Sequence, residues 1–286
     1  MSGSPITAQT QVYAVVGHPV RHSLSPALHN AWFQHHGIDA VYVALDTPEP
    51  DVDLAKTLRD LGIHGANLTL PHKVAILPDL AVLGPDAEAC GAVNTVVRRG
   101  AELHGYNTDR QGFLDGLDEL QVDPSGARAI VLGAGGAARS IVSALQHRGA
   151  ADVIVYNRTL AHAQALVSPG TTTVRALPWP DDPTLPCADL VVNTLPQPGR
   201  AAVEGLRFEQ LKPDAAWVDL NYWDPDPPHL RALAATGRRV QTGHAMLLHQ
   251  AARAFAHFTG IKPDLALGLD QLRRHDPGVA RSTQPR

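Results

Sequence analysis

Short runs of apolar and β-branched residues recur along the chain and alternate with longer segments that mix apolar and polar residues. A run of about four to eight such residues predicts a β-strand, and the longer segments between the runs predict helices. The expected strands are residues 12–17, 40–45, 64–70, 127–133, 152–157, 189–193, 216–220 and 238–243. Alternating strands and helices are typical of α/β proteins with mostly parallel sheets, so we expect this fold class.

Residues 92–109 interrupt the alternation, because two strand-like runs lie there on either side of the sequence RRGA. Two strands joined by so short a connection predict an antiparallel hairpin. The hairpin would bring Asn94, Asn107 and Asp109 near one another. We expect a domain boundary directly afterwards, within a helix that begins near Arg110.

A glycine-rich turn follows the strand expected at residues 127–133. In the sequence AIVLGAGGAARS, Gly133, Gly135 and Ala138 fit the pattern G-x-G-x-x-G/A, and Gly136 is a further small residue. The first glycine permits a tight turn, the second lets the backbone approach a pyrophosphate, and the third small residue lets the helix pack on the strand. The N–H groups at the start of the helix would then face the phosphates. This strand–turn–helix context predicts a dinucleotide site.

The end of the next expected strand indicates which dinucleotide binds. Enzymes that use NAD usually place Asp or Glu there to hold the ribose 2′-hydroxyl. This chain has Asn157 at that position and Arg158 after it. A guanidinium can pair with a 2′-phosphate in bidentate fashion, so the sequence favours NADP over NAD.

Two serines lie at the expected start of the first helix. Ser25 and Pro26 suit the N-cap and the first helical position, and Gly37 suits the end of that helix. Ser23 is a second hydroxyl near the same helix start. Two hydroxyls in this position could bind a carboxylate or simply cap the helix, and the residues alone favour neither.

The stretch NLTLPHK, residues 67–73, ends an expected strand at Pro71. In a regular strand the side chains of Asn67 and Thr69 would point to one face, because strand residues alternate between faces. Lys73, taken alone, is most simply a charge at the solvated end of the strand. His72 is expected to be a loop histidine rather than a catalytic group, although histidine is well suited to carry protons.

Composition narrows the class of protein further. A length of 286 residues predicts two domains, and the formal net charge of −4 gives no reason to expect a nucleic-acid partner. Fifteen histidines show no metal-ligand spacing, so no metal is expected, and two cysteines fit a reducing cytoplasm. The first residues do not resemble a signal peptide, and no apolar run is long enough to span a membrane. We expect a cytoplasmic protein with a small-molecule substrate.

Seven motifs together resemble the shikimate dehydrogenase family. They occur in the family's order over roughly residues 12–260: HSLSPALHN, NLTLPHK, GAVNT, GYNTDRQG, GAGGAARS, NRT and GHAMLLHQAARAF. The resemblance implies an N-terminal α/β substrate domain and a Rossmann-type doubly wound dinucleotide-binding domain with a cleft between them. It also implies NADPH-dependent, reversible reduction of 3-dehydroshikimate to shikimate in the chorismate and aromatic amino-acid pathway.

The resemblance assigns roles to individual residues. It makes Lys73 and Asp109 a catalytic pair, in which Asp109 fixes the lysine that supplies a proton as hydride reaches the ketone. The implied substrate contacts are Ser23, Ser25, Asn67, Thr69, Lys73, Asn94, Asp109, Tyr222 and Gln250. The implied NADP contacts are Gly133, Ala134, Gly135, Gly136, Ala137, Ala138, Asn157, Arg158, Thr159, Thr194, Gly243 and Met246.

The chain departs from the family pattern in three places. His162 stands where the family commonly has a second basic residue near the 2′-phosphate, and residues 193–200 and 219–230 differ from the usual loops. Two alternatives therefore stay open: a quinate/shikimate or aminoshikimate dehydrogenase of broader specificity, and a non-catalytic NADP-binding paralogue that acts as a sensor. The retained Lys73 and Asp109 argue against a sensor, which needs no proton-transfer pair.

The expected organisation has four parts. Residues 1–110 form the substrate domain, 111–244 the Rossmann domain, and 245–272 C-terminal helices that pack back on the substrate domain. Residues 273–286 lack periodicity and are expected to be a loose tail. The expected assembly is a monomer or a homodimer.

Overall fold

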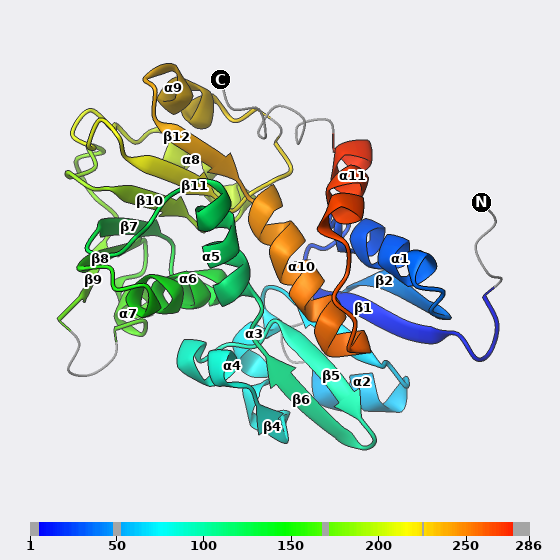
Figure 1. Ribbon diagram of the computed structural model, residues 1–286. Coiled ribbons are helices and arrows are strands. Elements are labelled where there is room, and N and C mark those ends of the chain that lie inside the picture. The colour runs from blue at the N-terminus through cyan, green and yellow to red at the C-terminus, as the bar shows by residue number, and fades with distance from the viewer. Residues whose placement is uncertain (1–5, 48–52, 168–171, 225, 277–286) are drawn as a thin grey trace. The chain divides into compact units, whose positions relative to one another are not determined.

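The computed structural model describes residues 6–47, 53–167, 172–224 and 226–276, which form two compact units. The first unit contains the described residues up to Gly112 together with Leu247–Asp276, and the second contains Phe113–Met246. Both divisions fall inside helices, α5 (Asp109–Glu119) and α10 (His244–Thr259). The chain therefore leaves the first unit through one helix and returns to it through another (Figure 1).

The first unit is built on a six-stranded mixed sheet in the order β2-β1-β3-β5-β6-β4. Its strands are β1 (Gln11–Gly17), β2 (Ala40–Asp46), β3 (Gly65–Leu68), β4 (Val82–Leu83), β5 (Thr95–Arg99) and β6 (Glu102–Tyr106). Strand β1 runs parallel to both β2 and β3, whereas β5 runs antiparallel to both β3 and β6. The chain builds outward from β1 in one direction and then in the other, which makes the boundary between β1 and β3 a topological switch point.

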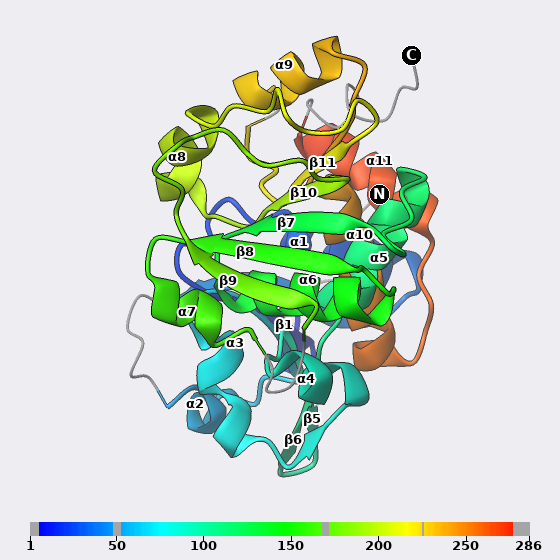
Figure 2. The same cartoon turned by 90° about the vertical axis from the view of Figure 1, so that its left-hand side faces the viewer.

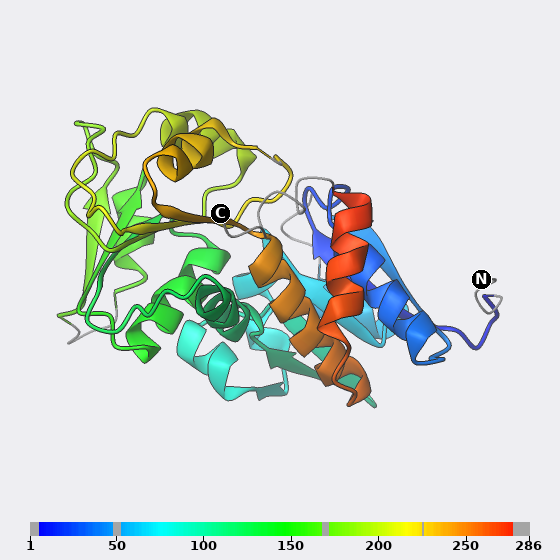
Figure 3. The same ribbon diagram turned by 45° about the horizontal axis from the view of Figure 1, so that its top comes forward.

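Helices cover both faces of this sheet. One face packs on α2 (Leu54–Asp60), α3 (His72–Ala75) and α4 (Pro85–Cys90), with a short 3₁₀ turn at Leu77–Asp79. The other face packs on α1 (Ser25–His35) and α10, and α11 (Leu265–His275) lies against α1 (Figures 1 and 3). The indole of Trp32 donates to the carbonyl of Asp264 at 2.9 Å, and a Cβ on Gly268 would lie 2.7 Å from that indole. Only a glycine lets α11 approach α1 so closely.

The second unit is a doubly wound parallel sheet in the order β12-β11-β10-β7-β8-β9. Its strands are β7 (Arg128–Leu132), β8 (Asp152–Asn157), β9 (Val174–Pro178), β10 (Leu190–Asn193), β11 (Ala216–Asp219) and β12 (Arg239–Thr242). Its helices are α6 (Gly136–His147), α7 (Leu160–Gln164), α8 (Arg200–Glu204) and α9 (Pro228–Ala235), with a 3₁₀ turn at Gln197–Gly199. This order is that of the Rossmann fold, and its switch point lies between β7 and β10.

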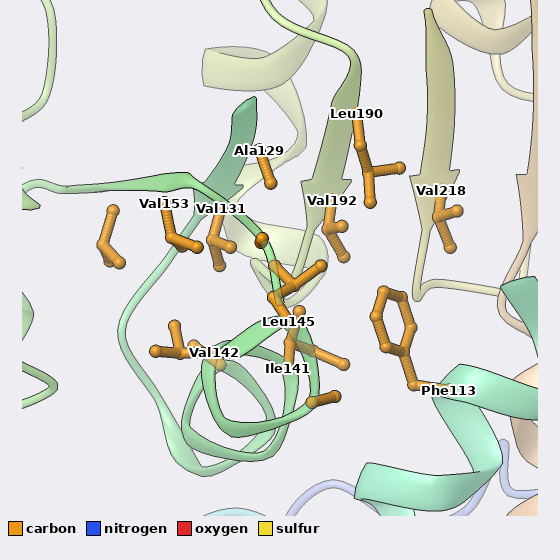
Figure 4. Close-up of a cluster of buried hydrophobic side chains, with 14 of the residues drawn as sticks. Phe113, Ala129, Val131, Ile141, Val142, Leu145, Val153, Leu190, Val192 and Val218 are labelled. Atoms are coloured by element: carbon orange, nitrogen blue, oxygen red, sulfur yellow. The ribbon is translucent and has the colours of Figure 1, made fainter. Parts of the chain in front are cut away.

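Two hydrophobic clusters bury opposite faces of the second sheet. Ala129 and Val131 of β7 point toward α5 and α6, where they meet Phe113, Ile141 and Leu145 (Figure 4). The alternate residues of β7, Ile130 and Leu132, point to the opposite face and belong to a second cluster with residues of α8 and α9. Strands buried on both faces are nearly continuous apolar runs, which explains why the sequence marks them so clearly.

All eight expected strands are present, with ends that shift by up to two residues. The hairpin around RRGA is also confirmed, as β5 and β6. Two short or peripheral strands, β4 and β9, were missed. Strand β4 has two residues and β9 lies at the edge of its sheet, so neither shows a strong apolar run.

Two local expectations need correction. Ser25 is not the N-cap of α1, because Leu24 occupies that position with a helical backbone and Ser25 is the first helical residue. The N–H of Ser25 instead bonds to Ser23 Oγ at 3.3 Å. Residues 273–275, expected in the tail, form the last turn of α11, and residues 277–286 lie outside the described residues. Across the described part of the chain, no helix is both long and apolar enough to cross a membrane.

Candidate active site

Several predicted substrate residues lie at one edge of the first sheet. The parallel strands β1 and β3 end there, so the loop that carries Ser23 and the segment that carries Thr69 leave the sheet side by side. Antiparallel pairing of β5 and β6 places Asn94, just before β5, and Asp109, just after β6, at the same edge. Ligands bind outside the carboxyl ends of strands at such a switch point.

Lys73 and Asp109 form an ion pair in this region. The Nζ of Lys73 lies 2.5 Å from Oδ2 of Asp109, and their side chains are 14% and 6% exposed. Lys73 belongs to α3, whose position is fixed by a bond from the Val93 N–H to the Lys73 carbonyl at 2.8 Å. A cation so largely removed from water is not an ordinary solvated charge at a strand end, so that simpler interpretation of Lys73 is wrong.

Asn94 connects Asp109 to its surroundings. Its amide nitrogen lies 2.8 Å from Asp109 Oδ1 and 2.9 Å from Thr108 Oγ1, and its amide oxygen accepts from the Thr108 N–H at 2.8 Å. Gln250 of α10 reaches the same amide nitrogen at 3.3 Å. One carboxylate oxygen of Asp109 is therefore held by Asn94 while the other binds Lys73. This double attachment fixes the orientation of the pair.

Asn67 lies next to Asn94, and both its amide oxygen and its amide nitrogen form hydrogen bonds. It accepts from the Tyr42 hydroxyl at 2.7 Å and donates to Thr95 Oγ1 at 2.9 Å and to the Asn94 carbonyl at 3.2 Å. Because Asn67 is buried and bonded to three groups, its amide supports Asn94 as well as lining the edge of the sheet.

Ser23, Ser25 and Thr69 also lie at this edge. Thr69 follows β3 and bonds through its N–H to the Val16 carbonyl at 2.9 Å. A Cβ on Gly17 would lie 2.3 Å from the Thr69 methyl, so glycine is required where the serine loop leaves β1. Ser25 is buried and Ser23 is half-buried. No hydrogen bond joins these hydroxyls to Lys73 within the described residues.

His72 is the first residue of α3 rather than part of a loop. Its Nε2 lies 2.7 Å from Thr47 Oγ1, and the side chain is almost fully buried. Burial lowers the pKa of His72, while the hydrogen bond with Thr47 opposes that shift. The imidazole is therefore neutral near neutral pH and ties α3 to the end of β2.

The carboxyl edge of the second sheet carries the glycine-rich turn. Gly133 follows β7 with φ of +106°, and a Cβ there would lie 2.6 Å from Thr194 Oγ1 after β10. A residue with a side chain fits neither this backbone nor this approach. Gly135 precedes α6, so Gly136, Ala137 and Ala138 present N–H groups that have no partner within the helix. The chemistry of this turn and helix start suits a pyrophosphate, with Ala134 between the two glycines.

The residues expected at the adenosine end surround the end of β8. Asn157 is the last residue of that strand, and its amide donates to the Thr159 carbonyl at 2.8 Å. Arg158 and Thr159 are exposed, as is His162 in the first turn of α7. An exposed guanidinium next to the strand end is accessible to an anion.

Thr194, Gly243 and Tyr222 follow β10, β12 and β11, respectively. Thr194 donates to the Leu132 carbonyl at 2.8 Å, and a Cβ on Gly243 would lie 2.1 Å from the Leu220 carbonyl oxygen. Tyr222 lies beside Trp223 and His244, with ring centroids 5.5 and 5.7 Å away. Met246 is buried in the core of the second unit, against α5 and α6. Its side chain is thus part of the packing beneath the proposed site.

Some side chains that hold these sites were not singled out from the sequence. They are Tyr42, Thr47, Thr95, Thr108, Asn193, Asp219 and His229. Thr95 and Thr108 occur in the motifs GAVNT and GYNTD, so their place in those motifs was an available signal. The others depend on contacts between distant segments. Within the described ranges, no cluster of three or more His, Cys, Asp or Glu side chains could hold a metal ion.

Comparisons with known proteins agree with the resemblance in the sequence. Residues 15–96 match the model of the shikimate dehydrogenase substrate binding domain, 117–198 that of shikimate / quinate 5-dehydrogenase, and 243–273 that of the shikimate 5'-dehydrogenase C-terminal domain. A shikimate dehydrogenase (NADP(+)) of Geobacter metallireducens is 41% identical over 270 residues, which cover 90% of this chain and 94% of the relative. The chain belongs to the shikimate dehydrogenase family.

Solved structures of the shikimate dehydrogenase family share this fold. The Thermus thermophilus enzyme in complex with NADP(H) and shikimate has a TM-score of 0.78 and 38% identity, covering 93% of this chain and 99% of that one. A Moorella thermoacetica relative is 40% identical over 287 residues, 96% of each chain. The family and the fold class expected from the sequence are therefore confirmed.

Proposed function

We propose that this chain is an NADP-dependent shikimate dehydrogenase that reversibly reduces 3-dehydroshikimate to shikimate. Family membership supports the reaction, and the buried Lys73–Asp109 pair at the carboxyl edge of the first sheet is the observation that favours catalysis over sensing. Such a reaction acts on a CH–OH group and belongs to the formation of chorismate and the aromatic amino acids.

In this proposal the first unit binds the substrate. The hydroxyls of Ser23 and Ser25 bind its carboxylate, which suits two hydroxyl donors near a helix start. The ring hydroxyls meet Asn67, Thr69 and Asn94 together with the catalytic pair. Gln250 and Tyr222 complete the proposed contacts. The hydrogen bonds among Asn94, Asp109 and Gln250 support this grouping because they hold the polar groups in fixed orientations.

Lys73 acts as the general acid in the direction of reduction. Negative charge grows on the ketone oxygen as hydride from NADPH reaches the carbon, and an ammonium group stabilises that charge and donates a proton. Asp109 orients the ammonium through one oxygen, while Asn94 holds the other oxygen. In the reverse reaction Lys73 accepts the proton from the alcohol.

The second unit binds NADP in this proposal. The turn from Gly133 to Ala138 cradles the pyrophosphate, and Asn157, Arg158 and Thr159 contact the 2′-phosphate. Thr194, Gly243 and Met246 lie at the nicotinamide end. The exposed Arg158 and the absence of an acidic residue at the end of β8 support NADP over NAD.

A direct assay tests the reaction and the cofactor together. The purified protein should oxidise NADPH when 3-dehydroshikimate is added and should reduce NADP when shikimate is added, with much weaker activity on NADH and NAD. Failure to turn over any of these pairs would contradict the enzyme assignment and favour the sensor. A clear preference for NAD would contradict the cofactor assignment.

One neighbour supports a second candidate, an enzyme of broader substrate range. The 5-ketofructose reductase of Gluconobacter sp. strain CHM43 has a TM-score of 0.77 and 29% identity, covering 94% of this chain. The same fold thus serves a ketone reductase with a different substrate. Parallel assays with quinate and an aminoshikimate decide this point, since comparable kcat/KM values would favour the broader enzyme.

A further inference from the structure

The loops after β10 and β11 are two of the three places in which this chain departs from its family pattern. The two strands are parallel neighbours (Figure 2), and the register pairs their last residues, Asn193 and Asp219. Both loops therefore leave the sheet together. Thr194 lies in the first loop and Tyr222 in the second.

Asp219 is a buried carboxylate on which three N–H groups and one imidazole nitrogen converge. Its Oδ1 accepts from the Asn193 side chain at 3.0 Å and from the main-chain and side-chain nitrogens of Asn221 at 2.9 and 2.7 Å. Its Oδ2 lies 2.8 Å from Nε2 of His229, at the start of α9. A carboxylate that is 2% exposed needs such bonds, because an unpaired buried charge is very costly.

The same group joins the loops to each other. The amide nitrogen of Asn221 also reaches the Leu195 carbonyl at 3.0 Å, and Asn193 Oδ1 accepts from the Leu195 N–H at 3.1 Å. The Asn221 carbonyl accepts from the Gly243 N–H at 3.1 Å. Asn221 thus connects the loops after β10 and β11 with the segment after β12. Thr194 and Tyr222 are adjacent in the sequence to residues of this hydrogen-bond network, and Gly243 takes part in it.

An ion pair adds a second connection farther along the loops. The guanidinium of Arg200 lies 2.7 Å from Asp224, and Arg200 also pairs with Glu204 of its own helix. Exposed pairs of this kind contribute little by themselves. The buried Asp219 network is therefore the main determinant of where both loops lie.

We propose that Asp219 and Asn221 are positioning residues that hold the two loops as one rigid element, so that Thr194 and Gly243 keep the arrangement in which NADP binds. This inference rests on the proposed cofactor function of these loops.

The test compares Asn221→Ala and Asp219→Asn with the wild-type protein and with Asn30→Ala. Asn30 is the matched control, since its side chain likewise makes two bonds at 2.8 Å, to the main chain of Tyr42 in the first unit. One readout is the dissociation constant of NADPH, measured by fluorescence titration. The other is the rate at which chymotrypsin cleaves after Tyr222 and Trp223 in the cofactor-free protein.

We expect Asn221→Ala to weaken NADPH binding roughly five- to tenfold, the effect of losing one or two hydrogen bonds, and to speed loop cleavage by a similar factor. Asp219→Asn should do the same or more, and Asn30→Ala should change neither readout. If Asp219→Asn does not fold, Asn221→Ala decides the question.

A wild-type value in either readout for Asn221→Ala would overturn the inference, even if its melting temperature falls, because the side chain would then be merely structural. The cleavage assay needs no cofactor. A failure of this inference is therefore distinct from a wild-type protein that binds no NADPH, which would instead count against the proposed function.

Discussion

At the scale of single residues, Lys73 is fixed both through its side chain and through its main chain. Its ammonium meets Asp109, and its backbone carbonyl accepts from the Val93 N–H, so the side chain and the main chain are both fixed. His72, its neighbour in the chain, is bonded to Thr47 and buried. We infer that the two adjacent residues have different roles: Lys73 faces the substrate, and His72 holds α3 in place.

Replacing Lys73 with alanine tests this assignment. Removal of a general acid should lower kcat about 10²-fold or more, while NADPH binding changes little. Steady-state kinetics with 3-dehydroshikimate and NADPH, together with a cofactor titration, measure both. Lys56→Ala is the control, because Lys56 forms an exposed pair with Asp60 in the same unit. An unchanged kcat in Lys73→Ala would refute the role.

His29 has a different consequence, for stability. It is fully buried, and its ring stacks on that of Tyr42 with 4.2 Å between the ring centroids. Neither ring nitrogen has a hydrogen-bond partner among the described residues. Burial lowers the pKa of His29 from 6.5 to about 3. Between pH 6.5 and pH 3, His29 is therefore protonated in the unfolded chain but neutral in the folded chain. The free energy of unfolding falls as the pH drops through this range.

His29→Phe should remove this part of the pH dependence while keeping a stacked ring. Between pH 7 and pH 5 the wild type should lose about 2 kcal/mol more of its free energy of unfolding than the variant does. Urea denaturation at several pH values measures the two slopes. Burial also lowers the pKa of His22, His64, His72 and His257, so a residual slope is expected. Parallel slopes in both proteins would show that His29 is not the source.

At the scale of elements, the candidate site residues of each unit lie near the carboxyl ends of parallel strands. In the second unit the turn after β7 and the loop after β10 meet at the switch point. There Thr194 lies so close to Gly133 that a Cβ on Gly133 would not fit. The start of α6 lies at the same place. The sheet topology therefore creates the turn that we propose for the pyrophosphate, and Gly133 permits its backbone conformation.

Gly133→Ala should disturb this element specifically. The added methyl group would lie 2.6 Å from Thr194 Oγ1, so the loop must shift and NADPH should bind at least about tenfold more weakly. Gly126→Ala is the control, because Gly126 also has a positive φ, +69°, but open space around its Cβ position. Isothermal titration of NADPH into both variants measures the difference. Equal affinities would mean that the turn does not contact the cofactor.

At the scale of the whole molecule, the chain crosses between its two units twice. The first unit is assembled from the start of the chain and from residues 247–276, so it is complete only with the C-terminal helices. Each unit contains one cysteine outside any disulfide, Cys90 buried in the first and Cys187 exposed in the second. The two thiols therefore report on the two units separately.

A thiol titration is the matching prediction. In the native protein one thiol, that of Cys187, should react rapidly with a disulfide reagent, and both should react after denaturation. Cys187→Ser should abolish the rapid reaction, and Cys90→Ser should leave it intact. Two rapidly reacting thiols in the native wild type would show that the first unit opens around α4.

The expected domain limits, the cytoplasmic location and the choice between monomer and homodimer stay predictions. Sedimentation analysis tests the assembly, folding of isolated segments tests the domain limits, and cell fractionation tests the location. The roles of the named site residues are likewise proposals, of which the variants above examine those of Lys73 and Gly133.

The sequence by itself determined the local features of this protein. Apolar runs marked all eight expected strands, Gly133 and Gly135 marked the turn between β7 and α6, and the ordered motifs marked the family. These features are readable because the spacing of apolar residues and the backbone freedom of glycine act within a few residues of one another. The error at Ser25 was local too, since a helix boundary of one residue depends on the backbone of Leu24.

The tertiary structure alone decided which side chains meet. Lys73 and Asp109 are 36 positions apart, Asn94 and Gln250 are 156 apart, and Asn193 and Asp219 are 26 apart, yet each pair shares a hydrogen bond. The order of strands in each sheet creates these meetings, and that order depends on burial summed over the whole fold. No local pattern encodes such a sum, which is why the network around Asp219 emerged only from the folded chain.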